Sequence, residues 1–414
     1  MKLRKCWWAV IVALFILGCG GASGPVELHL RVASTMYQAA NVPVHVAVNL
    51  PDGWSRVPAE EIAVVLRPAD HPEIQVPGQI IRDAEDQPEV WWILPETAAN
   101  APTEWTATLS RGQADPATAF HWTDSPGKHL DLTFGDRKVL RYEYEIDENY
   151  PRGEHLTALN KTFYHLYDLA GEHLITNGPE EGLWSHHRGI MIGWRDVGFR
   201  GQELSFWGME DRTFQKHIRF LQQIAGPVVA RSTALIHWDD STGTTIIEEK
   251  RTATVFRQPA PTIALLDFAS SLTAVNGPVH LDGNAEHGGV QYRAHNDVAD
   301  GAPGSAKPTY YFHQDGIDPH TDYDLPWVGM MYGLNGKNYS VLDMDNPNNP
   351  DSTIWSAYRD YGRFGPFFRT DLAADQTLTI HYRFWIAESN MPDRTMLSGM
   401  DQAYVAPPSV RVTN

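Results

Sequence analysis

The sequence has few cysteines and few basic residues, and no long apolar segment follows its first eighteen positions. Only two of its 414 residues are cysteines, so neither a framework of several disulfides nor a metal site made of several thiolates can form. No later apolar run reaches the roughly 18–20 residues that a membrane-spanning helix requires. Lys and Arg number 33 against 51 Asp and Glu, a formal net charge of −18. This charge argues against a nucleic-acid partner, because few cations are present to displace counterions from phosphates.

Aromatic residues, by contrast, are abundant. The chain has 14 Trp, 16 Tyr and 15 Phe, with 33 Gly and 28 Pro scattered among them. This composition favours an all-β fold and sites that stack against the flat faces of ligands. The length predicts two or three domains with a large core.

The N-terminus has the pattern of a bacterial lipoprotein signal. Basic residues at positions 2, 4 and 5 precede an apolar segment over residues 7–17, which is too short to span a bilayer of about 30 Å. The run Ile16-Leu17-Gly18-Cys19 resembles a lipobox, whose cysteine is lipidated and becomes the mature N-terminus. A plain signal peptide with an incidental cysteine is the alternative.

The lipoprotein interpretation has three consequences. It predicts a signal peptide over residues 1–18, lipidation of Cys19 and a tether over residues 19–25. The acyl chains would anchor the protein to a membrane without spanning it. Residue 20 is Gly rather than Asp, which resembles lipoproteins sorted to the outer membrane, so we expect an extracytoplasmic location facing the periplasm or the cell surface.

Short alternating segments predict an N-terminal β domain over residues 26–125. Every second residue from Val42 to Val48 is valine, the period-two pattern of a half-buried strand. Further candidate strands are separated by turns with Pro and Asp, and they cover residues 62–66, 90–94 and 105–109. Regular short strands over about a hundred residues predict an immunoglobulin-like β-sandwich.

Residues 130–394 predict one large antiparallel β unit with longer strands. In the run from Leu378 to Ile386 every second residue is apolar. The unit is too long for one small sandwich, so we expect a double sandwich of the supersandwich kind. One stretch, Arg212–Ile224, predicts a short surface helix, and residues 395–414 predict a C-terminal tail.

The first polar run that suggests chemistry is Trp184-Ser185-His186-His187-Arg188-Gly189, which follows Asn177. Adjacent residues on a strand face opposite sides, so only one of the two histidines enters a given pocket unless the backbone kinks, which Gly189 would permit. Arg188 adds an anion-binding guanidinium beside a titratable pair. The alternative is a core histidine beside a solvated one.

The second run is Glu286-His287-Gly288-Gly289-Val290-Gln291-Tyr292-Arg293. Glu286 is placed to orient or deprotonate His287, the pairing that general base catalysis uses near neutral pH. A loop with a surface ion pair is the alternative. A third run, Tyr358-Arg359-Asp360, lies among aromatic residues and predicts either a sugar-binding wall or a salt bridge under a loop.

These runs resemble the bacterial PmoA-like family, in the same order over about residues 140–390. The resemblance is carried by residues 160–165, 185–194, 286–293, 324–328, 344–347 and 357–364. It implies a secreted protein of a polysaccharide-degrading bacterium, with a β architecture like that of sugar-active double sandwiches. Where relatives often have His after Phe-Trp, this chain has Gly208. The family's methane oxygenase label implies little, because a membrane methane monooxygenase needs several spanning helices.

Together these observations predict a lipid-anchored protein that acts on carbohydrate as a hydrolase or lyase. The predicted catalytic residues are His186, His187, Glu286 and His287. The predicted substrate-binding residues are Asn177, Arg188, Trp194, Gln291, Arg293, Tyr358, Arg359 and Asp360.

Two reaction types remain open at this point. Glycoside hydrolysis requires a second carboxylate beside Glu286, for which Asp282, Asp343 and Asp360 are candidates. Proton abstraction beside a carboxylate requires instead a base and a cation. His187 or His287 would supply the base, and the cation would come from Arg188 or Arg293.

Two alternatives from other classes also remain. The same aromatic and polar residues would suit a non-catalytic glycan-binding lipoprotein. A metal site is the other alternative, in which His186 or His187 joins Glu286 and His287 around Zn²⁺ with one open position. No other cofactor is expected, and the expected partners are a carbohydrate ligand and a membrane.

Overall fold

The protein, represented by a computed structural model, is described over residues 24–147, 159–178, 182–209 and 211–413. These residues fold almost entirely into antiparallel β-strands, which confirms the predicted all-β class. The predicted signal peptide over residues 1–18 and the predicted lipidation site Cys19 lie outside the described residues. Within the described part, no helix is long and apolar enough to cross a membrane.

The N-terminal sheet has seven strands, namely β1 (Val26–Val32), β2 (Ala40–Ala47), β3 (Ile62–Pro68), β4 (Val76–Arg82), β5 (Pro88–Glu96), β6 (Thr103–Arg111) and β28 (Val410–Thr413). Their order is β2-β5-β4-β3-β6-β1-β28. The edge strands β2 and β28 lie beside each other, so the sheet curls around its core. That core includes Val44, Trp92 and Leu109. Two short 3₁₀ helices are η1 (Ala59–Glu61) and η2 (Pro116–Thr118).

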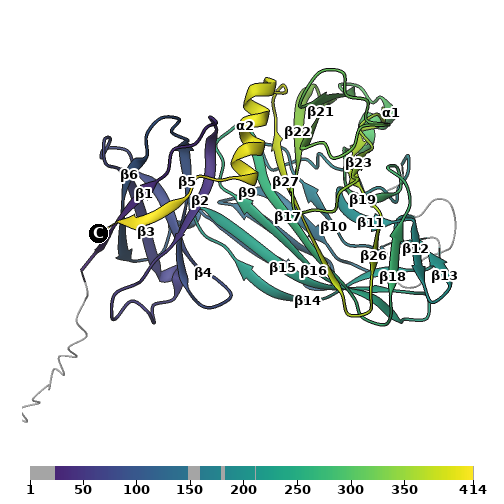
Figure 1. Ribbon diagram of the computed structural model, residues 1–414, viewed down its shortest axis with the longest axis horizontal. Coiled ribbons are helices and arrows are strands. Elements are labelled where there is room, and N and C mark those ends of the chain that lie inside the picture. Colours follow the sequence, from purple (N-terminus) through teal and green to yellow (C-terminus); the bar gives the residue numbers. More distant parts are fainter. Residues whose placement is uncertain (1–23, 148–158, 179–181, 210, 414) are drawn as a thin grey trace, which may run out of the picture.

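The C-terminal segment predicted as a tail is ordered structure. It contains α2 (Arg394–Val405) and β28, which pairs antiparallel with β1. Asp393 caps the helix, because its carboxylate accepts a hydrogen bond of 2.9 Å from the Met396 backbone N–H. In Figure 1 the yellow C-terminal segment runs from α2 back to the purple N-terminal sheet.

The second part contains two large antiparallel sheets. The first comprises β7 (Phe120–Ser125), β8 (His129–Phe134), β9 (Arg137–Glu143), β10 (Phe163–Leu166), β11 (Ile190–Trp194), β19 (Gly288–Arg293) and β24 (Arg363–Phe364). The second comprises β14 (Phe214–Ile224), β15 (Val229–Asp239), β16 (Thr245–Phe256), β17 (Thr262–Ala274), β27 (Thr377–Ala387), β22 (Lys337–Asp345), β21 (Trp327–Leu334) and β20 (Ala306–Phe312). One continuous core joins the inner faces of both sheets.

Smaller elements complete the second part. A four-stranded sheet contains β13 (Gln202–Leu204), β12 (Asp196–Phe199), β18 (Val279–Asp282) and β26 (Thr370–Leu372). A pair is formed by β23 (Ile354–Trp355) and β25 (Pro366–Phe367), and α1 (Asn296–Asp300) is a single short helix.

Two segments differ from the predictions. Residues 212–224 were predicted as a helix, but β14 is an edge strand with register shifts at His217/Arg219 and at Phe220/Gln222. At each bulge the alternation of apolar and polar residues shifts by one position, so the spacing of apolar residues resembles that of a helix. Strand β7 falls within residues 26–125, yet it pairs with β8 in the second part.

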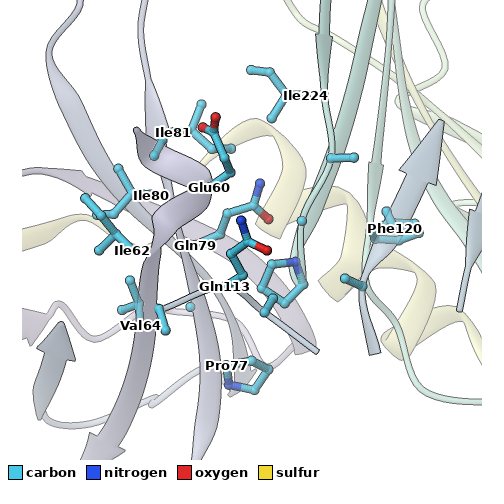
Figure 2. Close-up of a pocket in the computed structure, with 18 of the residues that line it drawn as sticks. Glu60, Ile62, Val64, Pro77, Gln79, Ile80, Ile81, Gln113, Phe120 and Ile224 are labelled. Atoms are coloured by element: carbon cyan, nitrogen blue, oxygen red, sulfur yellow. The ribbon is translucent and has the colours of Figure 1, made fainter. Parts of the chain in front are cut away.

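The two parts are joined by buried contacts. Ile81 and Trp91 of the N-terminal sheet pack with Val229, Phe256 and other residues of the second part in one apolar cluster. Beside this contact lies a cleft of about 1140 Å³. Figure 2 shows residues from both parts lining it, among them Ile62 and Ile80 on one side and Phe120 and Ile224 on the other.

Candidate functional site

The candidate site lies on the outer face of the sheet that contains β10, β11 and β19. Alternate residues of β11 and β19 enter the main core, and these are Ile190, Ile192, Val290 and Tyr292. Met191 and its register partner Gln291 lie between them in sequence, so they point to the opposite face. There Met191 packs with Phe163 and Trp207. Gly193 allows this packing, because a Cβ at that position would collide with the Phe206 carbonyl.

His186 and His187 lie together in the turn that leads into β11. Their ring centroids are 4.3 Å apart, so the pair is not divided between two faces as a regular strand would require. The chain enters β11 through Gly189, which has a φ of +38° and donates its N–H to the Asn177 carbonyl at 2.8 Å. The glycine kink that the sequence permitted is therefore present.

His187 is enclosed by rings and has no hydrogen bond on either nitrogen. Only 3% of the residue is exposed. Its ring lies 6.0 Å from that of Tyr361 and 5.3 Å from that of Trp207. Burial, reinforced by the charges of neighbouring cations, holds the pKa of His187 well below its usual value, so the imidazole is neutral.

His186 is closer to solvent and is also held neutral. Burial, followed by the positive charges of Lys161 and Arg188, lowers its pKa to about 3. Lys161 is buried, and its Nζ donates hydrogen bonds to the carbonyls of His186, at 3.2 Å, and Trp207. The lysine therefore joins the histidine turn to the Trp207 segment.

His287 reaches the same group of side chains. Its ring lies 6.1 Å from that of Trp207, and its charge acts on His186. Its Nδ1 lies 2.9 Å from Oδ1 of Asn284. The amide oxygen can only accept, so Nδ1 is the donor of this hydrogen bond. We call His186, His187, His287, Trp207 and Tyr361 the histidine cluster.

Glu286 does not orient His287, contrary to the prediction. Its carboxylate forms a salt bridge with Arg359 and accepts a hydrogen bond of 3.1 Å from the Tyr358 hydroxyl. Asn284, and not the Glu286 carboxylate, forms the hydrogen bond that orients His287. The ring of Tyr358 also stacks on that of His320, with ring centroids 3.9 Å apart. The predicted aromatic wall therefore lies next to the Glu286–Arg359 salt bridge.

Two buried arginines lie under the cluster. Arg293 and Arg363 are fully buried, and their guanidinium carbons lie 5.2 and 5.8 Å from the centre of the Tyr361 ring. Gln291 is held between Arg363, whose Nη1 donates to its Oε1 at 2.8 Å, and the Ser356 hydroxyl, which donates at 2.9 Å. Gln291 therefore fixes the position of Arg363.

Trp184 is the exposed aromatic residue of the site. The residue is 51% exposed, and the centroid of its ring lies 6.2 Å from that of the His186 ring. Its backbone has a φ of +55°, a region that bulky residues rarely adopt. Such strained residues concentrate at functional sites.

Four predicted substrate-binding residues have other roles in this structure. Trp194 is fully buried in the main core and donates its Nε1–H to the Phe368 carbonyl at 3.0 Å. Asp360 is on the surface and pairs with Lys307 at 2.6 Å. Asn177 and Arg188 support the histidine turn, because they donate hydrogen bonds to the carbonyls of His187 and Ser185.

Several residues of the site were not predicted from the sequence, namely Lys161, Trp184, Trp207, Asn284, Tyr361 and Arg363. Each lies within or beside a run that was singled out, so proximity was the available signal. Among the described residues, no group of three His, Cys, Asp or Glu side chains is placed to hold a metal ion.

Comparison with protein families places the chain in a family of unknown function. The family model described as "Family of unknown function (DUF6807)" matches residues 129–399, so the chain belongs to that family. This finding overturns the resemblance to the PmoA-like family. A comparison with curated proteins finds no match.

Comparison with solved structures finds a chain described as a kojibiose phosphorylase from human microbiome. The two are 10% identical with a TM-score of 0.27, and the alignment covers 70% of this chain. This chain spans only 36% of the length of that protein. A likeness this weak carries no argument about function.

Proposed function

We propose that the protein binds carbohydrate at the histidine cluster and removes a proton from the bound sugar. The observation that carries this proposal is Trp184, an exposed indole in a strained backbone conformation beside His186. Sugar rings stack on exposed aromatic faces, and convergent polar groups then fix their orientation. His186, His287 and the Glu286–Arg359 pair supply those polar groups.

His287 is the proposed base. It is partly exposed, and Asn284 holds its proton on Nδ1, so Nε2 is the atom that accepts the substrate proton. In an elimination, the C–H bond breaks and its proton goes to Nε2, while its electron pair forms a C=C bond. The C–O bond to the leaving sugar breaks as this C=C bond forms, its electron pair leaves with the oxygen, and the departing oxygen takes the proton from the imidazolium.

Hydrolysis by a carboxylate pair has less support from the geometry. It requires two carboxyl groups about 5–10 Å apart. Glu286 is bound to Arg359, and none of the three candidate partners accompanies it as a second free carboxylate. Asp282 pairs with Arg369, Asp360 pairs with Lys307, and Asp343 is buried in the interior.

A panel of polysaccharides and oligosaccharides, with detection of unsaturated products by absorbance, tests the proposal. We expect His287→Ala to abolish turnover while sugar binding remains, and Trp184→Ala to weaken binding at least tenfold. His71→Ala is the matched control, because that histidine lies on an exposed turn of the N-terminal part. Binding without turnover by the wild type would leave a glycan-binding protein, and no binding to any glycan would refute the proposal.

The proposed location is extracytoplasmic, with a lipid anchor at Cys19 on the outer membrane. Its support is the lipobox-like run that ends at Cys19 and the glycine that follows it. Carbohydrate outside the cytoplasm is the substrate to which such an anchored protein would have access.

A further inference from the structure

Two arginines beneath the histidine cluster are buried, and the part of the chain that the structure describes supplies no counter-charge to either. Among the described residues, neither Arg293 nor Arg363 forms a salt bridge, although both are fully buried. Arg293 Nε and Arg363 Nη2 also have no hydrogen-bond partner. The two guanidinium groups lie near the same ring, that of Tyr361.

The groups that these arginines do contact are neutral. Arg293 donates to the carbonyls of Ala294, at 2.9 Å, and Tyr361, and over longer distances to Leu183 O, at 3.3 Å, and Asn296 Oδ1, at 3.2 Å. The Asp300 carboxylate acts on Arg293 from farther away, but its hydrogen bond is with Asn296, at 2.7 Å.

Arg363 has the same kind of surroundings. It donates to the Tyr361 hydroxyl at 3.1 Å, to Gln291 Oε1 at 2.8 Å and to Ser356 Oγ at 3.4 Å. All three acceptors are uncharged, so its charge is solvated by dipoles alone. A guanidinium surrounded in this way retains a strong affinity for an anion.

Two other buried arginines, Arg251 and Arg383, are each paired with a carboxylate. Arg251 is fully buried and forms two hydrogen bonds of 2.7 Å with Glu249. Arg383 pairs with Asp267 at 2.5 and 2.8 Å. Among the described residues, Arg293 and Arg363 therefore differ from Arg251 and Arg383, each of which has a carboxylate partner.

Burying two unpaired like charges is costly. The desolvation penalty of an ion in a protein interior amounts to several kcal/mol unless an opposite charge offsets it. Burial, with the charge of Arg363, lowers the pKa of Arg293 to about 10, so the group is still charged at neutral pH. The fold therefore holds two positive charges ready for an anion.

We propose that Arg293 and Arg363 bind the carboxylate of an acidic sugar, which makes a uronic acid residue the substrate of the site. This inference rests on the proposed function. The carboxylate approaches from the side of Leu183 and Trp184, which are 41% and 51% exposed and lie beside Arg293 and His186. It replaces the long bond from Arg293 to the Leu183 carbonyl. A carboxylate matches the planar fork of a guanidinium, with two parallel hydrogen bonds.

The position of the carboxylate would also suit the proposed proton removal. The proton next to a carboxylate is acidified when cations stabilise the charge that develops on its oxygens. Arg293 and Arg363 would supply that stabilisation, and the Nε2 atom of His287 would receive the proton. A bound uronate would thus contact both the two arginines and the proposed base, His287.

Calorimetric titration of the full chain with matched acidic and neutral oligosaccharides tests the inference. Oligogalacturonate and oligoglucuronate are compared with oligomers of galactose and glucose. We expect the wild type to bind an acidic oligomer at least tenfold more tightly than its neutral counterpart. Arg363→Gln should remove most of this preference, and Arg363→Lys should retain part of it.

Controls separate charge recognition from misfolding. Arg31→Gln removes an exposed arginine that pairs with Glu104, and it should leave the preference unchanged. In thermal unfolding, the acidic oligomer should raise the Tm of the wild type and not that of Arg363→Gln, because a ligand stabilises only the form that binds it.

Two outcomes overturn different parts of the argument. Equal binding of acidic and neutral oligomers by the wild type, or an unchanged preference in Arg363→Gln, would overturn the carboxylate site and leave the proposed function standing. Failure to bind any oligomer, acidic or neutral, would overturn the proposed function and this inference with it.

Discussion

The imidazole ring of His187 lies nearly parallel to the phenol ring of Tyr361, with 6.0 Å between the ring centroids and 14° between the planes. The same phenol ring is within cation–π distance of both buried arginines, Arg293 and Arg363. One aromatic side chain therefore contacts the neutral histidine and both cations. The arrangement of the site depends on that ring.

Two substitutions at Tyr361 separate the ring from its hydroxyl group. Tyr361→Leu removes the ring contacts, and we expect it to lower the unfolding free energy by about 2–4 kcal/mol and to weaken sugar binding. Tyr361→Phe keeps the ring and loses only the hydrogen bond of 3.1 Å from Arg363 Nε, so a loss of about 1 kcal/mol is expected. Urea denaturation and titration of both variants measure the difference. Equal losses in the two variants would show that the hydroxyl carries the effect.

The sequence was sufficient to predict the fold class because strand burial follows the period-two pattern. In β27, Ile380, Tyr382, Phe384 and Ile386 all enter the main core, as their alternation indicated, although the residues between them are also buried from Tyr382 onward. The α2 helix was missed, although Asp393 three residues before Met396 is an N-cap signal. The pairing of β28 with β1 joins opposite ends of the chain, and no local pattern predicts such a contact.

Only part of the site was predictable from the sequence, because contacts between distant parts of the chain decide the rest. The histidines and arginines stand in conspicuous runs, so His187, His287 and Arg293 could be singled out from the sequence, and the structure places the rings of Trp207 and Tyr361 beside them. Which carboxylate pairs with which cation depends on tertiary contacts, so the partner of Glu286 was predicted wrongly. Trp207 was noticed only for the Gly208 that follows it, and its position between His187 and His287 depends on packing over Met191.

Gln79 on β4 connects the N-terminal sheet to the second part. This buried side chain accepts hydrogen bonds from the N–H groups of Val228, at 3.0 Å, and Val229, at 2.8 Å, and donates one to the Val229 carbonyl at 3.2 Å. Gln79→Leu leaves two buried N–H groups without acceptors, so the unfolding free energy should fall by about 2–4 kcal/mol. Limited proteolysis should also cut between the two parts sooner than in the wild type.

A matched control for Gln79 exists within the N-terminal sheet. Gln87 donates one hydrogen bond of 2.7 Å to the Val48 carbonyl, and it makes no bridge to the second part among the described contacts. Gln87→Leu should therefore cost about 1 kcal/mol without changing the proteolysis between the parts. If Gln87→Leu accelerated that proteolysis as much as Gln79→Leu, the bridging role of Gln79 would be wrong.

Asp343 gives the protein a pH-dependent stability. It is fully buried on β22, and neither carboxylate oxygen has a hydrogen-bond partner. Burial, with the negative charge of Asp345, raises the pKa of Asp343 well above its usual value of 3.8. The folded chain therefore keeps a proton that the unfolded chain loses. Stability from this group is complete below about pH 4 and is lost as the pH rises toward the folded-state pKa, at about 1.4 kcal/mol per pH unit.

Asp343→Asn tests this dependence directly. The amide has nearly the shape of the protonated carboxyl and carries no titratable proton, so the variant lacks the loss described for the wild type. Groups that do not interact with Asp343 titrate equally in both chains, so the difference between their unfolding free energies reports Asp343 together with its coupling to Asp345. In urea denaturation from about pH 4 to pH 8, the unfolding free energy of the variant should rise relative to that of the wild type as the pH rises. Parallel curves would mean that Asp343 ionises in the folded protein at its ordinary pKa, in which case an unseen partner must compensate its charge.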